Sequence, residues 1–234
     1  MRKSKERSNN QARRASDQRR VTGNPIVAVV VVIFTMVEGD LQVLLIRRSA
    51  PPEQGLWAIP GGLLRPGEAL VDAAVRKLVD ETGVEDVYLE QLYTFNDLDA
   101  ATPGGAVAVT YFALVDHTRV RLAERADWQP AWHSMRGLPK LAFKNNHVLS
   151  YALERLRNKL EYTNVAYSLL PGTFTLSKLQ RVYESILGRR LDKRNFRKRM
   201  LSREIIEATS ERQAEGAGRP ALLYRFSARK PVEL

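Results

Sequence analysis

The sequence predicts an α/β protein in two folded parts: a sandwich of β-strands and helices, followed by a smaller module of two helices and a β-hairpin. The chain has 234 residues, which is enough for one large domain or two small ones. With 44% apolar residues it can bury a core. β-Branched runs alternate with a helical pattern in the first two thirds, whereas helical patterns and a basic excess dominate the last third.

The net charge of +11 is distributed unevenly along the chain. Residues 1–20 hold eight Lys and Arg against two acidic residues, residues 21–171 hold 14 against 17, and residues 172–234 hold 15 against seven. The whole excess therefore lies in an N-terminal tail and a C-terminal segment. Such asymmetry indicates contact with nucleic acid or another anionic surface. A solvated basic face is the alternative.

The composition excludes several kinds of site. The chain has no Cys, which removes disulfides, Cys-ligated zinc, Fe–S clusters and thiol nucleophiles, and its three His are too few for a His-rich metal site. The longest apolar run, residues 26–37, is shorter than the roughly 20 residues that a membrane span needs. The basic N-terminus has no adjacent apolar segment with a cleavage site. We therefore expect a soluble, cytoplasmic protein with no membrane partner.

The first folded part begins with a predicted β-hairpin. Two β-branched runs, residues 26–36 and 41–47, are separated by the turn-like sequence Val37-Glu38-Gly39-Asp40. After a loop at residues 50–60, a helix is predicted over residues 68–82 and ends at Gly83. Its apolar residues at helical spacing are Val71, Ala74, Val75 and Leu78. Further strands are expected at residues 87–95 and 106–115, with a mixed segment at 127–138.

The second folded part reads as helix, helix, hairpin. A helix at residues 146–160 carries one apolar stripe and leads into it. Thr175 is an N-cap for the next helix, which ends at Gly188. Asp192 then precedes a second helix over residues 193–200. The hairpin strands are residues 205–209 and 222–226, on either side of a Gly-containing tip at 214–218.

The helix at residues 193–200 has an apolar face and a basic face. At about 100° per residue, Phe196 and Met200 point one way, whereas Arg194 and Lys198 point the opposite way. An aromatic anchor inside and basic residues outside fit the recognition helix of a helix-turn-helix in the major groove of DNA. With the basic hairpin that follows, the module is typical of a winged helix-turn-helix. The candidate DNA-binding residues are Lys193, Arg194, Asn195, Arg197, Lys198, Arg212 and Arg219.

Two of these residues are candidates for reading DNA sequence. Arg194 and Asn195 have side chains that can form bidentate contacts with guanine and adenine edges. The other basic residues are expected to contact phosphates, which position a protein without reading bases. One alternative is a protein-interaction module with a solvated basic face. RNA binding is disfavoured because no stacking aromatics mark an exposed sheet.

A glycine-rich loop and a cluster of acids lie between residues 57 and 84. The run reads Gly62-x5-Glu68-x7-Arg76-Lys77-Leu78-x-Asp80-Glu81-x-Gly83-Val84, after Trp57-Ala58-Ile59-Pro60-Gly61-Gly62. Acids on one helix face can load Mg²⁺, which polarises a pyrophosphate and activates water. The pattern resembles the Nudix box, G-x5-E-x7-R-E-U-x-E-E-x-G-U with U aliphatic, over roughly residues 22–142 of this chain. The resemblance implies a Nudix-type α/β/α sandwich.

One position departs from that pattern. Lys77 stands where the family has a metal-binding Glu, so an ammonium competes with a cation for Glu81, four residues later on the same helix face. We therefore expect the cleft to bind a nucleotide diphosphate and to hydrolyse it poorly or not at all, with no catalytic residue and no required cofactor. The alternative is that Glu68, Asp80 and Glu81 still hold Mg²⁺ and support turnover. The candidate effector-binding residues are Arg47, Arg48, Trp57, Gly62, Glu68 and Glu81, with surface charge as the alternative for the two arginines.

A Nudix domain followed by a winged helix is the arrangement of the Nudix-related transcriptional regulators of NAD metabolism, the NrtR family. Residues 153–163 resemble its interdomain helix, and residues 191–197 resemble its DNA-binding helix. The resemblance implies a homodimeric repressor of NAD biosynthesis or salvage genes that binds a palindromic operator in double-stranded DNA. Its effector would be ADP-ribose or a related nucleotide. Phe143-Lys144-Asn145 departs from the family's usual Phe-Asp-His, which bears on effector binding.

The expected domains are a basic disordered tail at 1–21, a Nudix-like effector domain at 22–142, an interdomain helix at 143–164 and a winged helix-turn-helix at 165–234. The tail has almost nothing apolar to bury, and it either attracts phosphates or is a passive leader. Two other functions stay open. An active ADP-ribose pyrophosphohydrolase carrying a DNA-binding domain would hydrolyse its nucleotide with Mg²⁺. A non-enzymatic RNA-processing factor on the same scaffold would prefer RNA to duplex DNA.

Overall fold

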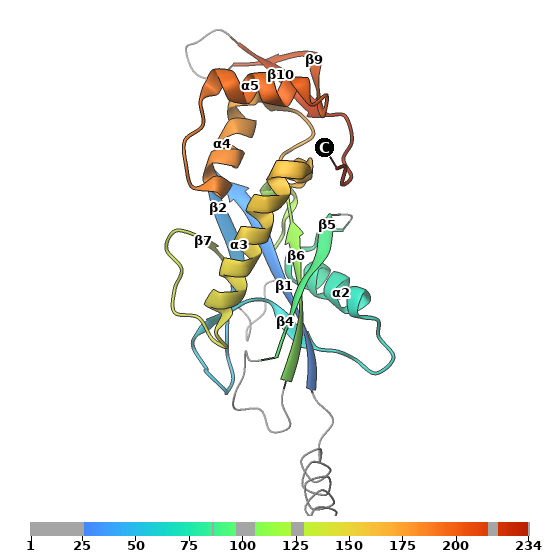
Figure 1. Ribbon diagram of the computed structural model, residues 1–234. Coiled ribbons are helices and arrows are strands. Elements are labelled where there is room, and N and C mark those ends of the chain that lie inside the picture. Colours follow the sequence, from blue (N-terminus) through green and yellow to red (C-terminus); the bar gives the residue numbers. More distant parts are fainter. Residues whose placement is uncertain (1–25, 86, 97–105, 123–128, 215–219, 234) are drawn as a thin grey trace, which may run out of the picture.

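The computed structural model describes residues 26–85, 87–96, 106–122, 129–214 and 220–233 (Figure 1). The predicted disordered tail, most of the predicted hairpin tip and the candidate DNA-binding residue Arg219 lie outside the described residues. Trp128 of the predicted mixed segment does so too. None of the helices in the described ranges is long and apolar enough to cross a membrane.

The first part of the chain forms a seven-stranded mixed sheet. Its main strand order is β3-β2-β1-β6-β5, with β4 paired to β1 and β7 paired to β2. The strands are β1 (Ile26–Val37), β2 (Asp40–Arg47), β3 (Trp57–Ala58), β4 (Gly61–Leu63), β5 (Tyr88–Phe95), β6 (Ala106–Leu114) and β7 (Gln129–Ser134). The predicted hairpin is confirmed, because β1 and β2 pair antiparallel up to Val37 opposite Asp40. Glu38 and Gly39 between them have φ of +49° and +84°, as a two-residue type I′ turn requires.

Three strands of this sheet were not expected from the sequence. β3 and β4 have only two and three residues and lie in the segment that reads as a loop with Pro and Gly. Strands this short show no hydrophobic alternation, so only their pairing with β2 and β1 defines them. β7 carries Pro130 and His133, yet it pairs with β2 over its whole length. β3, β4 and β7 thus extend the sheet, and β4 brings Gly61 and Gly62 into it.

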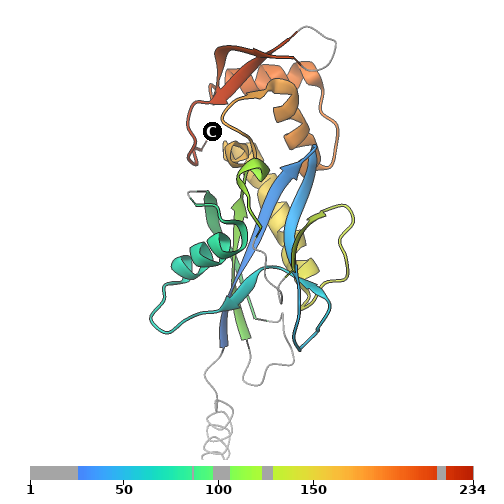
Figure 2. The ribbon, with the colours of Figure 1, turned by 180° about the vertical axis from the view of Figure 1, so that it is seen from behind.

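Two helices cover opposite faces of the sheet, as Figures 1 and 2 show. α2 (Leu70–Thr82) packs Ala74 and Leu78 into a cluster with Val31 and Ile33. α3 (Asn145–Tyr162) packs its apolar stripe into the other cluster, with Phe34 and Phe112. The predicted α/β/α sandwich is therefore confirmed.

The apolar residues predicted for α2 do not all face the core. Val71 and Val75 are 50% and 44% exposed, whereas Ala74 and Leu78 are buried. The buried face of α2 also includes Glu81 and Thr82, so it is rotated away from the two valines. Helical spacing alone did not reveal that a carboxylate takes part in the buried face.

The last third forms the predicted winged helix fold. A three-stranded sheet of order β8-β10-β9 supports two helices. The elements are β8 (Phe174–Thr175), α4 (Leu176–Leu187), α5 (Lys193–Ser202), β9 (Ile206–Gln213) and β10 (Ala221–Phe226), preceded by the 3₁₀ helix η2 (Val165–Leu169). A second 3₁₀ helix, η1 (His117–Arg119), lies between β6 and β7 in the first part of the chain. One continuous apolar cluster runs from Phe34 of β1 through Leu156 of α3 to Tyr183 of α4. The two domains are therefore joined by a common apolar core.

Candidate functional site

The two helices of the winged helix module begin and end as their sequences predict. The hydroxyl of Thr175 accepts from the backbone N–H of Lys178 at 3.1 Å, and Gly188 ends α4 in the left-handed conformation with φ of +69°. At the start of α5, the carboxylate of Asp192 accepts from the backbone N–H of Asn195 at 2.8 Å. Such N-caps satisfy backbone donors that have no partner within a helix.

The turn between α4 and α5 is fixed by Glu184. Its Oε1 accepts from the backbone N–H of Leu191 at 2.8 Å, and Gln180 donates to both Glu184 and the carbonyl of Leu191. The hydrogen bond from Leu191, followed by that from Gln180, holds the pKa of Glu184 below its ordinary value. The carboxylate therefore stays ionised and holds the backbone of the turn between α4 and α5.

α5 presents a basic face to solvent. Phe196 and Met200 are buried, and the Phe196 ring packs against Tyr183 of α4 at 5.3 Å between centroids. The predicted residues Lys193, Arg194, Asn195 and Lys198 are exposed. Arg197 is only partly exposed, with its Nε buried, and Arg212 is exposed on β9. Most of the described side chains expected to meet DNA are thus exposed to solvent, on α5 and on the hairpin.

Three further exposed basic residues close in sequence to the predicted set were not among the predicted DNA-binding residues. Arg189 and Arg190, in the turn after Gly188, are exposed, and so is Arg199 of α5. The guanidinium of Arg190 lies 3.7 Å from Glu184. Arg189 and Arg190 could have been noticed in the sequence, because they follow the helix-ending Gly188 in the turn that leads to the recognition helix.

A second candidate site is a cavity of about 310 Å³ at the start of β1. Apolar side chains of β1, β2, β4 and β6 line it, together with Arg48, Gly62, Phe143 and Asn145. The guanidinium of Arg48 lies 4.4 Å from the centre of the Phe143 ring. Asn145, the first residue of α3, accepts from the backbone N–H of Ile59 at 2.8 Å. α3 therefore starts at the wall of this cavity.

The predicted effector residues are placed differently around this cavity. Arg48 and Gly62 line it, whereas Arg47 and Trp57 are not among its lining residues. Arg47 and Trp57 pair with each other across β2 and β3, and the Trp57 ring packs edge-on against His133 at 4.4 Å. Glu68, in the loop before α2, and Glu81, on α2, are not among the lining residues of the cavity either. Ile26 and Leu63, which do line it, carry no sequence signal for ligand binding.

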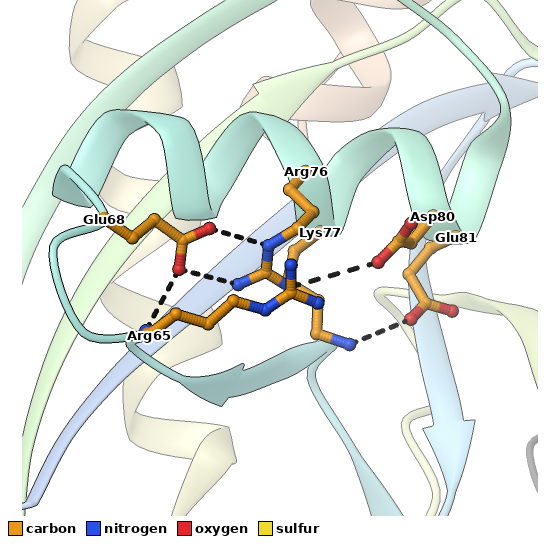
Figure 3. A network of polar contacts seen from close by, with 6 residues as sticks. All are labelled: Arg65, Glu68, Arg76, Lys77, Asp80 and Glu81. Carbon is orange, nitrogen blue, oxygen red and sulfur yellow. Dashed lines mark hydrogen bonds and ion pairs between the residues drawn. The ribbon is translucent and has the colours of Figure 1, made fainter.

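The charged residues of α2 and its entry loop form ion pairs with one another (Figure 3). Arg76 binds Glu68 through two hydrogen bonds of 2.7 and 2.9 Å and lies 4.0 Å from Asp80. Nζ of Lys77 lies 3.4 Å from Oε1 of Glu81, and the Glu81 side chain is 0% exposed. Each carboxylate of the motif therefore faces a cation from the chain itself.

These ion pairs bear on how the carboxylates could bind a divalent cation. The hydrogen bond from Arg76 lowers the pKa of Glu68 from 4.5 to about 2, so the pair is ionised at neutral pH. Across the described ranges, no group of three or more His, Asp or Glu is placed to hold a metal ion. Mg²⁺ needs oxygen ligands arranged octahedrally. In this structure Glu68 and Asp80 face Arg76, and Glu81 faces Lys77.

Comparison with known protein families matches both parts of the chain. The NUDIX domain matches residues 25–153, and the NrtR DNA-binding winged helix domain matches residues 166–226. The fold and the two sites therefore define a class of protein: a DNA-binding protein in which a winged helix follows a Nudix domain.

Relatives extend the match to nearly the whole chain. The ADPR responsive transcriptional repressor NtrR of Acinetobacter baylyi is 37% identical over 94% of this chain and 89% of its own length. Shewanella oneidensis NrtR in complex with a 27mer DNA is 35% identical, with a TM-score of 0.76 over 86% of this chain and 93% of that one. The chain therefore belongs to the NrtR family of transcriptional repressors.

Two further matches concern the Nudix part. The NUDIX domain of Shewanella oneidensis NrtR in complex with ADP ribose is 32% identical, with a TM-score of 0.51 over 57% of this chain and 90% of that one. An ADP-ribose pyrophosphatase of Methanocaldococcus jannaschii is 28% identical over 51% of this chain and 70% of its own length. Nudix relatives of this chain thus include both a regulator and a hydrolase.

Proposed function

We propose that this repressor controls genes of NAD biosynthesis or salvage and that ADP-ribose, bound in the Nudix domain, is its effector. The observation that carries the proposal is the exposed basic face of α5 in a chain whose other domain has a separate nucleotide-sized cavity. The relatives that respond to ADP-ribose or bind it support the choice of effector. A ligand can weaken DNA binding only by its difference in affinity between two arrangements of the protein.

The test is a gel shift with the full chain and DNA from upstream of NAD biosynthesis genes. We expect tight binding to one such fragment, and release of that fragment on addition of ADP-ribose but not of AMP. Binding that is equally tight to random DNA of the same length would contradict a role as a specific repressor. Binding that ignores ADP-ribose would contradict the choice of effector.

We propose further that the chain binds its nucleotide without hydrolysing it. The ion pair between Lys77 and the buried Glu81 supports this, since the ammonium lies where hydrolysis would require a metal-binding carboxylate. We expect Lys77→Glu to give or to raise Mg²⁺-dependent cleavage of ADP-ribose. The measurement is release of AMP and ribose 5-phosphate with Mg²⁺ present. Wild type that already cleaves as fast as the variant would contradict the proposal.

The second candidate function is an active ADP-ribose pyrophosphohydrolase that carries a DNA-binding domain. The similarity to the archaeal pyrophosphatase favours it. The same assay separates the two functions, because an active enzyme would show Mg²⁺-dependent turnover in the wild type. DNA binding alone does not distinguish them.

The proposed operator is palindromic and the proposed active form is a homodimer. Each chain carries one recognition helix, and helix-turn-helix dimers read two half-sites spaced by one helical turn of DNA or a multiple of it. We expect two chains per operator in sedimentation of the complex. A complex with one chain per operator would contradict this.

A further inference from the structure

We infer that Lys77 replaces a divalent cation in the nucleotide site, so that the chain holds the pyrophosphate of its effector without a metal. The inference rests on the proposed function, because it says how the proposed site binds ADP-ribose. It concerns a residue that would otherwise be read only as a loss from the Nudix motif. The ion pair, the position beside the cavity and the charge of α2 each support it.

The first observation is where the ammonium is fixed. Nζ of Lys77 lies 3.4 Å from Oε1 of Glu81, and the two side chains are 12% and 0% exposed. A buried carboxylate is costly unless a cation compensates its charge. Lys77 supplies that cation from one helical turn away on the same face of α2. The site is therefore electrostatically complete with no added ion.

The second observation is how close Lys77 lies to the cavity. Gly62 lines the cavity, and a Cβ at Gly62 would lie 3.1 Å from Cε and 3.9 Å from Nζ of Lys77. The lysine stem thus packs against the side of β4 that faces α2, because Gly62 pairs with Val29 of the cluster under α2. The cavity lies on the other side of β4, where Ala28 and Val30 line it. An anionic group that extends out of the cavity and around β4 at Gly62 would meet the ammonium. Lysine is a common binder of phosphate as a compact point charge.

The third observation is the charge around α2. Glu68, Asp80 and Glu81 are opposed by Arg65, Arg76 and Lys77, so three carboxylates meet three cations. A Glu in place of Lys77 would leave two negative charges in excess, and an anionic pyrophosphate would be repelled unless a metal intervened. Lysine at this position therefore removes the need for a metal in binding.

The test is calorimetric titration of ADP-ribose into the full chain, once with EDTA and once with Mg²⁺, with its non-hydrolysable α,β-methylene analogue used for every titration of Lys77→Glu. For the wild type we expect dissociation constants that agree within about twofold. For Lys77→Glu we expect roughly tenfold or greater loss of affinity in EDTA, with recovery in Mg²⁺. Lys77→Met, which keeps the length of the stem, should be weakened in both buffers. The matched control is Lys230→Glu, because Lys230 is exposed and distant from the cavity lining.

The outcomes separate this inference from the proposed function. Wild-type binding that requires Mg²⁺ would overturn the replacement by Lys77 and leave ADP-ribose as effector. Absence of binding in both buffers would overturn the effector, and with it the inference. Should Lys77→Glu melt below the assay temperature, Lys77→Met decides alone: unchanged affinity in EDTA would overturn the inference.

Discussion

At the scale of single residues, Arg194 is the side chain expected to read a base. It is exposed on the face of α5 opposite the buried Phe196. We expect Arg194→Ala to weaken operator binding by about 1–3 kcal/mol, because a bidentate contact to a base edge is worth that much. The measurement is the dissociation constant on the operator and on random DNA at one salt concentration. An equal loss on both would reduce Arg194 to a phosphate contact.

Glu68 tests whether the ion pair with Arg76 stabilises the fold. Because the pKa of Glu68 is lowered from 4.5 to about 2, the pair contributes stability that is fully present above pH 4.5 and is lost as the pH falls through 2. Glu68→Gln should therefore be less stable than wild type at pH 7, and the difference should shrink between pH 4.5 and 2. Urea unfolding at several pH values measures it. A difference that stays constant over that range, or one shared by the exposed Glu211→Gln, would contradict the expectation.

At the scale of elements, the N-cap of α5 gives a prediction of stability. The Asp192 carboxylate holds the backbone N–H of Asn195, and no helical carbonyl can accept from that donor. We expect Asp192→Ala to destabilise the chain by about 1 kcal/mol in urea unfolding. Asp192→Asn keeps an acceptor at this position and should change the stability by only a few tenths of a kcal/mol. A loss as large for Asn as for Ala would show that charge, rather than capping, is what matters.

The elements with long periodic patterns could be predicted, and the elements defined by long-range pairing could not. The ends of α4 and α5 could be predicted from Thr175, Gly188 and Asp192, which are local signals at helix ends. β4 comprises only Gly61–Leu63, and it is a strand because it pairs with β1. Such pairing with a distant strand cannot be predicted from the local sequence.

The same distinction applies to the candidate sites. The basic face of α5 follows from spacing within one helix, so its exposed residues could be identified in advance. The cavity is assembled from several strands and from the start of α3, and most of its lining is ordinary apolar sequence. Trp57 was expected at the effector, but its ring packs against His133 of β7, a strand that was not expected from the sequence.

At the scale of the whole molecule, α3 connects the two sites. Asn145 at its start lines the cavity, and farther along the helix Nε of Arg157 donates to the carbonyl of Ile186 in α4 at 2.8 Å. An 18-residue helix is about 27 Å long, so α3 spans the Nudix domain as a rigid element (Figure 1). The β1–β2 hairpin makes a second link, where the backbone N–H of Leu41 donates to Ser185 at 3.0 Å. α3 therefore contacts both the cavity and α4, so a shift of α3 at the cavity would act on its hydrogen bond to α4.

This arrangement predicts that Arg157 transmits the effector signal without binding either ligand. We expect Arg157→Ala to reduce the coupling between ADP-ribose and the operator by about 1 kcal/mol, or roughly fivefold in the ratio of operator affinities without and with ADP-ribose. Fluorescence anisotropy gives the four dissociation constants needed for the wild type and the variant. Arg155→Ala is the matched control, because Arg155 lies on the same helix but pairs with Glu90 of β5.

The ratio separates transmission from simple destabilisation. If Arg157 only supported the fold of the winged helix, its loss would weaken operator binding equally with and without ADP-ribose, and the ratio would stay at the wild-type value. If α3 transmits the signal, the affinity without ADP-ribose stays near wild type while the effector releases less DNA. Linkage requires the reciprocal effect, so saturating operator should then weaken ADP-ribose binding less in Arg157→Ala than in the wild type.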